Sequence, residues 1–516
     1  MSAGAADEVV FGAEPVTIAQ ICAVARGGAR AVLNRDPGYR RRLAASRESL
    51  ERQLAAGRVI YGVTTGVGES CENDIPPEQA DALSANLLRL HGCGTGAFLT
   101  EEDTAAVMAV RLASLARGAS AVRPALLERL VALLEHRILP LIPSEGSVGA
   151  SGDLTPLSYV AAAIAGEREV SFRGETMPAA RALELCGLAP LPLRSKEALA
   201  LMNGTSMMAG IACLAFERAH RLARAAAALS AVASDVMRGN ASHFDARIFA
   251  LKPHPGSALS AAWIRADLDY VPGAGGAAGA RVQDRYSLRC APQVLGVLLD
   301  ALTLYQGVLE TEINSVNDNP IVDADRDEVL HGGNFYGGHV AFAMDGLKAA
   351  VANVGDLMDR QLALLCNPAT NNGLPGDLIG AVGAGRLAHH GFKAMQITAS
   401  ALTAEALKLT MPASVFSRST ESHNQDKVSM GSIAARDCQR VLELTETVAV
   451  IELLALCQAV DLRGPETCRS RSRQLHRAVR AMVPRNDADR RQDVDIARVL
   501  ESLRAGALPF GAADPA

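Results

Sequence analysis

Long apolar segments with helical spacing, each ended by a short polar or glycine-rich island, are the feature that most constrains this chain. One such segment starts near residue 198, is interrupted by Asn203-Gly204, and continues rich in Ala and Leu to about residue 237. Two more long helices are expected at about 339–366 and 382–410. Helices this apolar must bury against one another. The pattern therefore predicts a mainly α fold, a bundle whose helix ends converge on a polar site.

The length of the chain, 516 residues, is enough for two or three domains. About half of the residues are hydrophobic, and aromatic residues make up only 4%, which favours a large, helix-rich, well-buried protein. We expect a smaller N-terminal domain over residues 1–197 and a long-helix bundle over residues 198–516. Within the first domain the pattern predicts a short strand near 8–11, a helix over 38–56 and a hairpin over 168–182.

Charge and cysteine usage narrow the function classes. The formal net charge is −5, and no basic run suggests a nucleic-acid partner. The ten cysteines are scattered without a Cys-x-x-Cys pair, which argues against a zinc or disulfide framework and for a reducing compartment. The first 15 residues lack an apolar core, and apolar stretches such as 222–234 carry Arg or Ser. We therefore expect a cytoplasmic protein with no metal site and no membrane span.

The tripeptide Ala150-Ser151-Gly152 lies in a run of small residues just before Asp153 and Thr155. By composition this is a tight turn that enters a helix. A strained backbone could also bring the nitrogen of Gly152 onto the carbonyl carbon of Ala150. Loss of two waters would then leave a five-membered ring with a methylidene group made from the serine side chain. That ring would be an electrophile, which no standard side chain is.

Other islands permit a structural or a functional interpretation when each is taken alone. Tyr61, at the edge of a glycine-rich loop, either anchors that loop or swings over a site. His91 ends a helix, where it can act as a cap. Asn203 interrupts an apolar segment and needs a buried partner. Tyr286 and Arg289 share a helical face, and Arg289 can bind a carboxylate or make an internal ion pair.

Taken together, the islands closely resemble the aromatic amino-acid ammonia-lyase and aminomutase family, which includes histidine, phenylalanine and tyrosine ammonia-lyases. The resemblance extends from about residue 57 to 450. The motifs that carry it, in chain order, are Tyr61 to Gly66, Ala150 to Leu154, Asn203 to Thr205, Gln283 to Arg289, Gly332 to Phe335, and Asn424 to Asp426. The family implies a fumarase/aspartase-like helical fold and a homotetramer whose active sites are built from more than one subunit.

The resemblance also implies a cofactor. The family uses 4-methylidene-imidazol-5-one (MIO), formed autocatalytically from the positions of Ala150, Ser151 and Gly152. In the mechanism favoured for the family, the substrate amine adds to the methylidene carbon and becomes a better leaving group. A base then removes the β-hydrogen. By resemblance Tyr61 is that base, and its pKa should be lowered by its surroundings.

The remaining roles are carried over by position. Arg289 would hold the substrate carboxylate, while Asn203 and Tyr286 would hydrogen-bond the ring or the substrate. Further residues expected in the same cavity are Asn319, Asn334, Phe335, Glu405, Asn424 and Gln425.

The choice of substrate depends on fewer residues. The selectivity pair before the Gly-rich run is Leu90-His91, and His91 can bond a phenol hydroxyl. Ser206 stands where histidine ammonia-lyases usually carry Gln, and Gly68-Glu69 resembles the aminomutase pattern. These positions favour L-tyrosine as substrate, with p-coumarate and ammonia as products.

Three alternatives stay open. A tyrosine 2,3-aminomutase would use the same residues and give β-tyrosine, because lyase and mutase differ by loop closure and product release. A histidine or phenylalanine ammonia-lyase would give urocanate or cinnamate. A helical assembly protein that kept the fold and lost the chemistry is disfavoured by the intact Ser151, Tyr61 and Arg289.

Overall fold

The computed structural model describes residues 7–272 and 281–511, and within them the chain forms eighteen α-helices and nine short β-strands. The mainly α prediction is confirmed. Contacts group the chain into two compact units. Unit 1 comprises Met1–Glu217, Tyr305–Asp345 and Pro412–Arg436, and unit 2 comprises Arg218–Leu304, Gly346–Met411 and Asp437–Ala516.

Neither unit is a continuous stretch of sequence, in contrast to the expected division between residues 197 and 198. All but one of the changes from one unit to the other fall within the four longest helices. These are α9 (Ser206–Val236), α13 (Ala291–Ile313), α14 (Gly338–Cys366) and α16 (Gly431–Arg463). Unit 1 is made of three separate stretches of the chain, so these two units do not correspond to a division of the sequence at one point.

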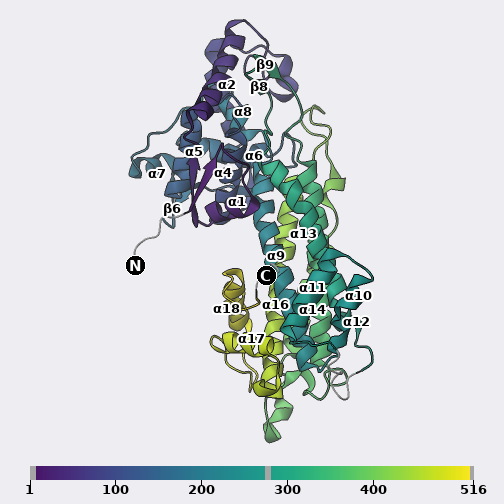
Figure 1. Ribbon diagram of the computed structural model, residues 1–516. Helices are drawn as coiled ribbons and strands as arrows, with labels where there is room; N and C mark the ends of the chain where they lie inside the picture. The colour runs from purple at the N-terminus through teal and green to yellow at the C-terminus, as the bar shows by residue number, and fades with distance from the viewer. Residues whose placement is uncertain (1–6, 273–280, 512–516) are drawn as a thin grey trace. The chain divides into compact units, whose positions relative to one another are not determined.

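Unit 1 opens with a β-α-β element. Strand β1 (Asp7–Phe11) pairs in parallel with β2 (Ala29–Leu33), and α1 (Ile18–Ala25) between them packs on α4 (Glu101–Leu115). Helix α2 (Pro37–Ala55) starts at an Asp36 N-cap, as the expected helix over 38–56 requires, and lies beside β8 and β9 (Figure 1). The first strand and the second helix thus confirm their predictions.

Three helices of unit 1, α3 (Ala80–Leu90), α6 (Leu154–Ile164) and α8 (Glu197–Met202), contact one another, and α6 begins just after the tripeptide. Helix α4 is buried at every position from Asp103 to Leu115. Helix α3 ends at Leu90 with His91 as its C-cap, since the glycine run that follows cannot extend it favourably. Residues Thr95–Phe98 instead form β3, which pairs with β5 (Pro143–Glu145).

The other short elements of unit 1 connect these helices. They are α5 (Pro124–His136), β4 (Leu139–Pro140), β6 (Glu169–Phe172), β7 (Glu175–Pro178), α7 (Ala179–Leu185), β8 (Ile321–Asp323) and β9 (Glu328–Leu330). Strands β6 and β7 form the predicted hairpin.

Unit 2 is a set of long helices whose buried side chains are mostly apolar, and polar contacts also form between them. Gln361 on α14 donates to the Ser230 hydroxyl on α9 at 2.9 Å, and the carboxylate of Glu446 on α16 accepts from Arg218 on α9 at 2.9 Å. Helix α11 (Pro255–Asp267) packs on α13 through Gly256, where a side chain would overlap α13. The predicted helix bundle is confirmed in this unit (Figure 1).

Shorter helices complete unit 2. They are α10 (Ala246–Ala250), α12 (Tyr286–Arg289), α15 (Lys393–Lys408), α17 (Ser470–Arg480) and α18 (Asp493–Arg504). Of the helices in the described residues, α13 alone is long and apolar enough to cross a membrane by length and composition, and only 39% of its most apolar window is buried.

Candidate active site

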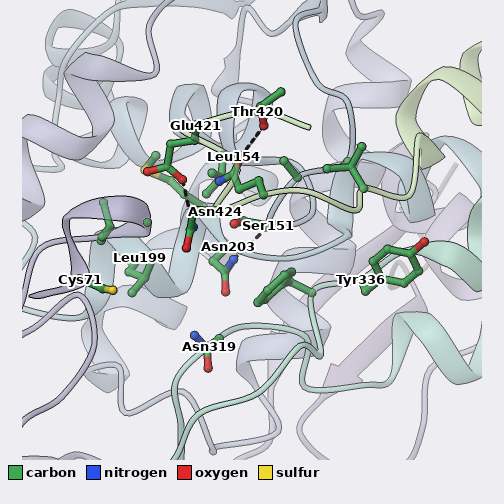
Figure 2. A pocket seen from close by; sticks show the side chains of 18 of the residues that line it. Cys71, Ser151, Leu154, Leu199, Asn203, Asn319, Tyr336, Thr420, Glu421 and Asn424 are labelled. Carbon is green, nitrogen blue, oxygen red and sulfur yellow. Dashed lines mark hydrogen bonds between the residues drawn. The ribbon is translucent and has the colours of Figure 1, made fainter. Parts of the chain in front are cut away.

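A cavity of about 580 Å³ opens in unit 1 around the tripeptide (Figure 2). Its size falls in the range of small-molecule sites. The predicted site residues that line it are Tyr61, Gly68, Leu90, His91, Ala150, Ser151, Asn203, Asn319, Phe335, Asn424 and Gln425. The other lining residues are Val67, Cys71, Leu87, Gly149, Leu154, Leu199, Met202, Gly332, Tyr336, Thr420, Glu421, Asp426, Lys427 and Val428. Five of the six motifs that carry the resemblance therefore meet at one cavity.

The backbone of the tripeptide is held in an unusual conformation. Ser151 has φ +49°, and glycines on either side of the Ala-Ser pair, Gly149 and Gly152, have φ +77° and +80°. Left-handed backbone is unfavourable for serine. A side chain at Gly152 would overlap the carbonyl of Gly204, so only glycine fits there.

The turn at Asn203-Gly204 forms hydrogen bonds with residues 151–153. The amide Nδ2 of Asn203 and the backbone N–H of Gly204 both donate to the Ser151 carbonyl, at 2.9 and 3.1 Å. In return the N–H of Asp153 donates to the Gly204 carbonyl at 2.7 Å. The other amide atom of Asn203, Oδ1, is buried and accepts no hydrogen bond from any described residue. The buried partner expected for Asn203 is thus the tripeptide itself.

The Asp153 carboxylate links the tripeptide segment to the first turns of two other helices. It occupies the N-cap position of α6, but its carboxylate does not cap that helix. It accepts instead from the Met208 N–H at 3.0 Å and from the hydroxyls of Ser432 and Ser147. Burial raises the pKa of Asp153 to about 6, against the lowering effect of these donors. Since Met208 and Ser432 lie in the first turns of α9 and α16, the N-terminal ends of three helices meet here.

Tyr61 lies on a loop fixed from both sides. Its neighbours Ile60 and Val63 are buried in a cluster with Leu50 of α2. Its hydroxyl accepts the Gly68 N–H at 2.7 Å. The expectation of a lowered pKa is wrong for this chain as described, because burial raises the pKa of Tyr61 and the nearby Glu421 charge adds to the effect, while the Gly68 N–H opposes it. The loop therefore holds Tyr61 at the cavity, but its surroundings do not favour the phenolate form.

His91 caps α3 at the wall of the cavity. Its Nδ1 lies 3.5 Å from the Thr155 hydroxyl, and its carbonyl accepts from Ser158 at 3.1 Å. Burial lowers the pKa of His91, with a smaller opposing effect from Glu421. The lowered pKa favours the neutral imidazole, whereas a helix C-terminus by itself would favour the charged imidazolium.

Glu421 is a site residue that the sequence reasoning missed. Its carboxylate lies over Gly68, accepts the Glu69 N–H at 3.0 Å and accepts from Asn424 at 3.2 Å. Figure 2 shows it beside Asn424 at the cavity. Its signal in the sequence was its place at the start of the polar island that also holds Gln425. The resemblance places a different acid, Glu405, in the cavity.

Several predicted residues do not line this cavity. Glu69 is next to it, Gly152 is buried behind Ser151, Ser206 is fully buried at the start of α9, and Asn334 donates to the Val316 carbonyl. The remaining three belong to unit 2 and are Tyr286, Arg289 and Glu405.

The three residues in unit 2 have local partners. Arg289 donates to the Asp284 carbonyl at 3.0 Å, and its guanidinium carbon lies 4.7 Å from the centre of the Tyr286 ring. The predicted shared face of these two residues is therefore confirmed. Glu405 forms an exposed ion pair with Arg440 at 2.8 Å.

The residues around Ser151 fit an MIO group. The left-handed backbone, the two donors on the Ser151 carbonyl and the unpartnered Oδ1 of Asn203 form a cradle with no room for a side chain at Gly152. Within the described residues no three His, Cys, Asp or Glu side chains gather as a metal site.

Comparisons with known proteins agree with this geometry. The family described as aromatic amino acid lyase matches residues 16–481. The chain is 40% identical over 503 residues to a histidine ammonia-lyase of Gloeobacter violaceus, with 97% of each chain covered. It is 41% identical over 509 residues to a tyrosine ammonia-lyase of Cupriavidus metallidurans, covering 95% of this chain and 94% of the relative.

The fold is similar to that of solved structures as well. The crystal structure of a tyrosine aminomutase from Streptomyces globisporus superposes with a TM-score of 0.90 at 35% identity, and 97% of each chain is covered. The resemblance inferred from the six motifs is confirmed along nearly the whole chain. The chain belongs to the aromatic amino acid lyase family of ammonia-lyases and aminomutases, and it is a carbon–nitrogen lyase.

Proposed function

We propose that this cavity eliminates ammonia from L-tyrosine to give p-coumarate. The observation that carries the proposal is the position of the His91 imidazole at the cavity wall. The Thr155 hydroxyl lies beside its Nδ1, which leaves Nε2 for the phenol hydroxyl of a substrate. A buried site that hydrogen-bonds a substrate hydroxyl discriminates strongly against an analogue that lacks it. The tyrosine ammonia-lyase relative lends further support to this choice.

The proposal includes formation of MIO from Ala150, Ser151 and Gly152. When present, the ring supplies an electrophilic methylidene carbon for the substrate amine. The amide of Asn203 and the N–H of Gly204 would hold the ring carbonyl, as they hold the Ser151 carbonyl. The neighbouring helix N-termini favour negative charge that develops there.

Tyr61 would remove the β-hydrogen of the substrate. Its hydroxyl already accepts one backbone N–H, but its raised pKa means that the phenolate needs further positive charge. We propose that Arg289 of another subunit provides that charge and binds the substrate carboxylate, while Tyr286 beside it hydrogen-bonds the substrate. Tyr286 is 73% exposed in the single chain, and α13 exposes Val297 and Leu304, as expected of helices that meet in a homotetramer.

Subunit sharing has a direct test. Tyr61→Phe and Arg289→Met would each be inactive as homo-oligomers. Mixed oligomers from co-expression of the two would regain part of the activity, because some sites combine an intact Tyr61 with an intact Arg289. Light scattering should give the mass of four chains. An active monomer would contradict the shared site.

The reaction is tested by incubation with L-tyrosine, L-phenylalanine and L-histidine, followed by separation of products. We expect p-coumarate and ammonia from tyrosine. The likeness to a tyrosine aminomutase makes β-tyrosine the second candidate product, and β-tyrosine as the main product would exclude the lyase assignment. Urocanate formation without turnover of tyrosine would instead assign the chain with its histidine ammonia-lyase relatives.

The cofactor has its own readouts. The intact mass should be lower than the sequence mass by two waters. Ser151→Ala should fold, keep its full mass and lose nearly all activity, whereas Tyr61→Phe should keep the ring and lose turnover. We also propose a cytoplasmic location, because all ten cysteines are free thiols, and cell fractionation would test it.

A further inference from the structure

Arg111 is a buried cation next to the site that the reaction described above does not use. It lies on α4 and is fully buried. Burial lowers the pKa of Arg111 to about 10, so the guanidinium stays protonated at neutral pH. A buried charge is expensive unless it is paired. Such a cost beside a functional site calls for an explanation from function.

The partners of Arg111 are all neutral. Its Nη1 donates to the Asn203 carbonyl at 3.0 Å, and its Nη2 donates to the side-chain oxygens of Ser114 and Asn317 at 3.0 and 3.1 Å. The carboxylate with the largest electrostatic effect on it, Asp318, pairs instead with Lys196 at 2.6 Å. Across the two described ranges of the chain, no carboxylate oxygen accepts a hydrogen bond from Arg111, and its Nε has no partner.

The guanidinium therefore fixes one piece of backbone, the turn at residues 203–205. It holds the Asn203 carbonyl directly, and it holds Thr205 through Asn317, whose Nδ2 donates to the Thr205 hydroxyl at 2.9 Å. A side chain at Gly204 would overlap Arg111, so the glycine permits this approach. The same turn supplies both donors to the Ser151 carbonyl.

Formation of the ring changes the charge on the Ser151 carbonyl. The Gly152 nitrogen bonds to the Ala150 carbonyl carbon, and the Ala150 oxygen leaves as water with the protons of the Gly152 and Ser151 nitrogens. The Ser151 hydroxyl and α-proton leave as the second water. The Gly152 nitrogen is bonded to the Ser151 carbonyl carbon. As this nitrogen gives up its proton, negative charge moves onto the oxygen of the Ser151 backbone carbonyl. Fixed donors aimed at that oxygen stabilise the charge without reorganisation.

We propose that Arg111 is a positioning residue for ring formation, which holds the 203–205 turn so that its two donors stay on the Ser151 carbonyl. The proposal rests on the proposed function, because it presupposes that the ring forms. It concerns the making of the electrophile and not its later use. Arg111 does not itself line the cavity and acts on Ser151 through Asn203.

The experiment measures intact mass and thermal midpoint on the same samples of the full chain. The variants are Arg111→Met, which removes the charge and all donors, and Arg111→Lys, which keeps the charge and fewer donors. The matched control is Lys348→Met. Lys348 is also fully buried and holds the Met411 carbonyl and Asp437, far along the chain from the tripeptide and in unit 2.

We expect the wild type and Lys348→Met to lack two waters in nearly every chain. Arg111→Met should retain its full mass in most folded chains, and Arg111→Lys should form the ring more slowly, as shown by mass after timed incubation. Ser114→Ala, a milder loosening of the guanidinium, should slow ring formation if Arg111→Met does not fold.

A complete ring in folded Arg111→Met, or in both Arg111→Lys and Ser114→Ala without delay, would overturn the proposal. Equal ring loss in Lys348→Met at equal loss of thermal midpoint would reduce the effect to stability and would overturn it too. A wild-type chain at full mass would instead overturn the proposed function itself.

Discussion

Asp153 makes the stability of the tripeptide region depend on pH. Its carboxyl is fully buried, and its pKa is raised from 3.8 to about 6. A raised pKa means that the folded state favours the neutral acid. The stabilisation from this group is therefore fully present below about pH 4 and is lost as the pH rises through about 6. The total loss is about 3 kcal/mol, roughly half of it above pH 5.

Asp153→Asn removes this titration while keeping a side chain of the same shape. Ring formation would complicate the comparison, so both chains should carry Ser151→Ala. Between pH 5 and pH 8, the chain that keeps Asp153 should lose about 1.5 kcal/mol of unfolding free energy relative to the chain with Asp153→Asn. Urea unfolding at a series of pH values measures the difference. Parallel stability curves for the two chains would refute the reasoning.

Three further carboxyl groups give predictions of different sign. Glu446→Gln should destabilise unit 2 by about 3 kcal/mol at pH 7, because Arg218 and Arg504 lower the pKa of this buried group and would lose its carboxylate charge. That loss should shrink as the pH falls below about 4.5 in urea unfolding, since a depressed pKa contributes stability only above the ordinary value. Glu452→Gln should gain thermal midpoint relative to wild type as the pH rises, because burial raises the pKa of a carboxyl whose oxygens have no partner in the described chain; a constant difference would contradict this. Glu421→Gln should move the acidic limb of the pH–rate profile to lower pH, because its charge raises the pKa of Tyr61; an unmoved limb would argue against Tyr61 as the base.

The helices could be predicted where one face or the whole segment is apolar over many residues. The long helix to Val236 and its break at Asn203-Gly204 follow from local sequence alone. Strand β3 could not be predicted in this way, because its hydrogen-bond partner β5 lies some 45 residues later and no local pattern announces the pairing. The two compact units could not be predicted from local sequence for the same reason, since they depend on contacts between distant stretches.

The site divides along similar lines. Residues that stand in unusual sequence contexts, such as Ser151 among small residues, were found. The direction of the shift in the Tyr61 pKa could not be predicted from the sequence. Burial of Tyr61 and its proximity to the Glu421 charge come about only when residues far apart in the sequence meet. Arg111 had one signal, a lone cation in the apolar run from Ala105 to Leu115, whose meaning depends on the Asn203 carbonyl facing it.

The bracing of the tripeptide from far downstream sets the time at which it can react during synthesis. Ser432, which donates to the Asp153 carboxylate, is 279 residues after Asp153, and the Met430 N–H donates to the Val148 carbonyl at 3.0 Å. A ribosome adds about 5–20 residues per second, so these braces follow the tripeptide by roughly 15–55 s. Ser151 would thus leave the ribosome as an ordinary serine. Formation of the proposed MIO ring, which we expect to need these contacts, would follow synthesis of residue 432, and shorter nascent chains would expose no electrophile to cellular thiols and amines.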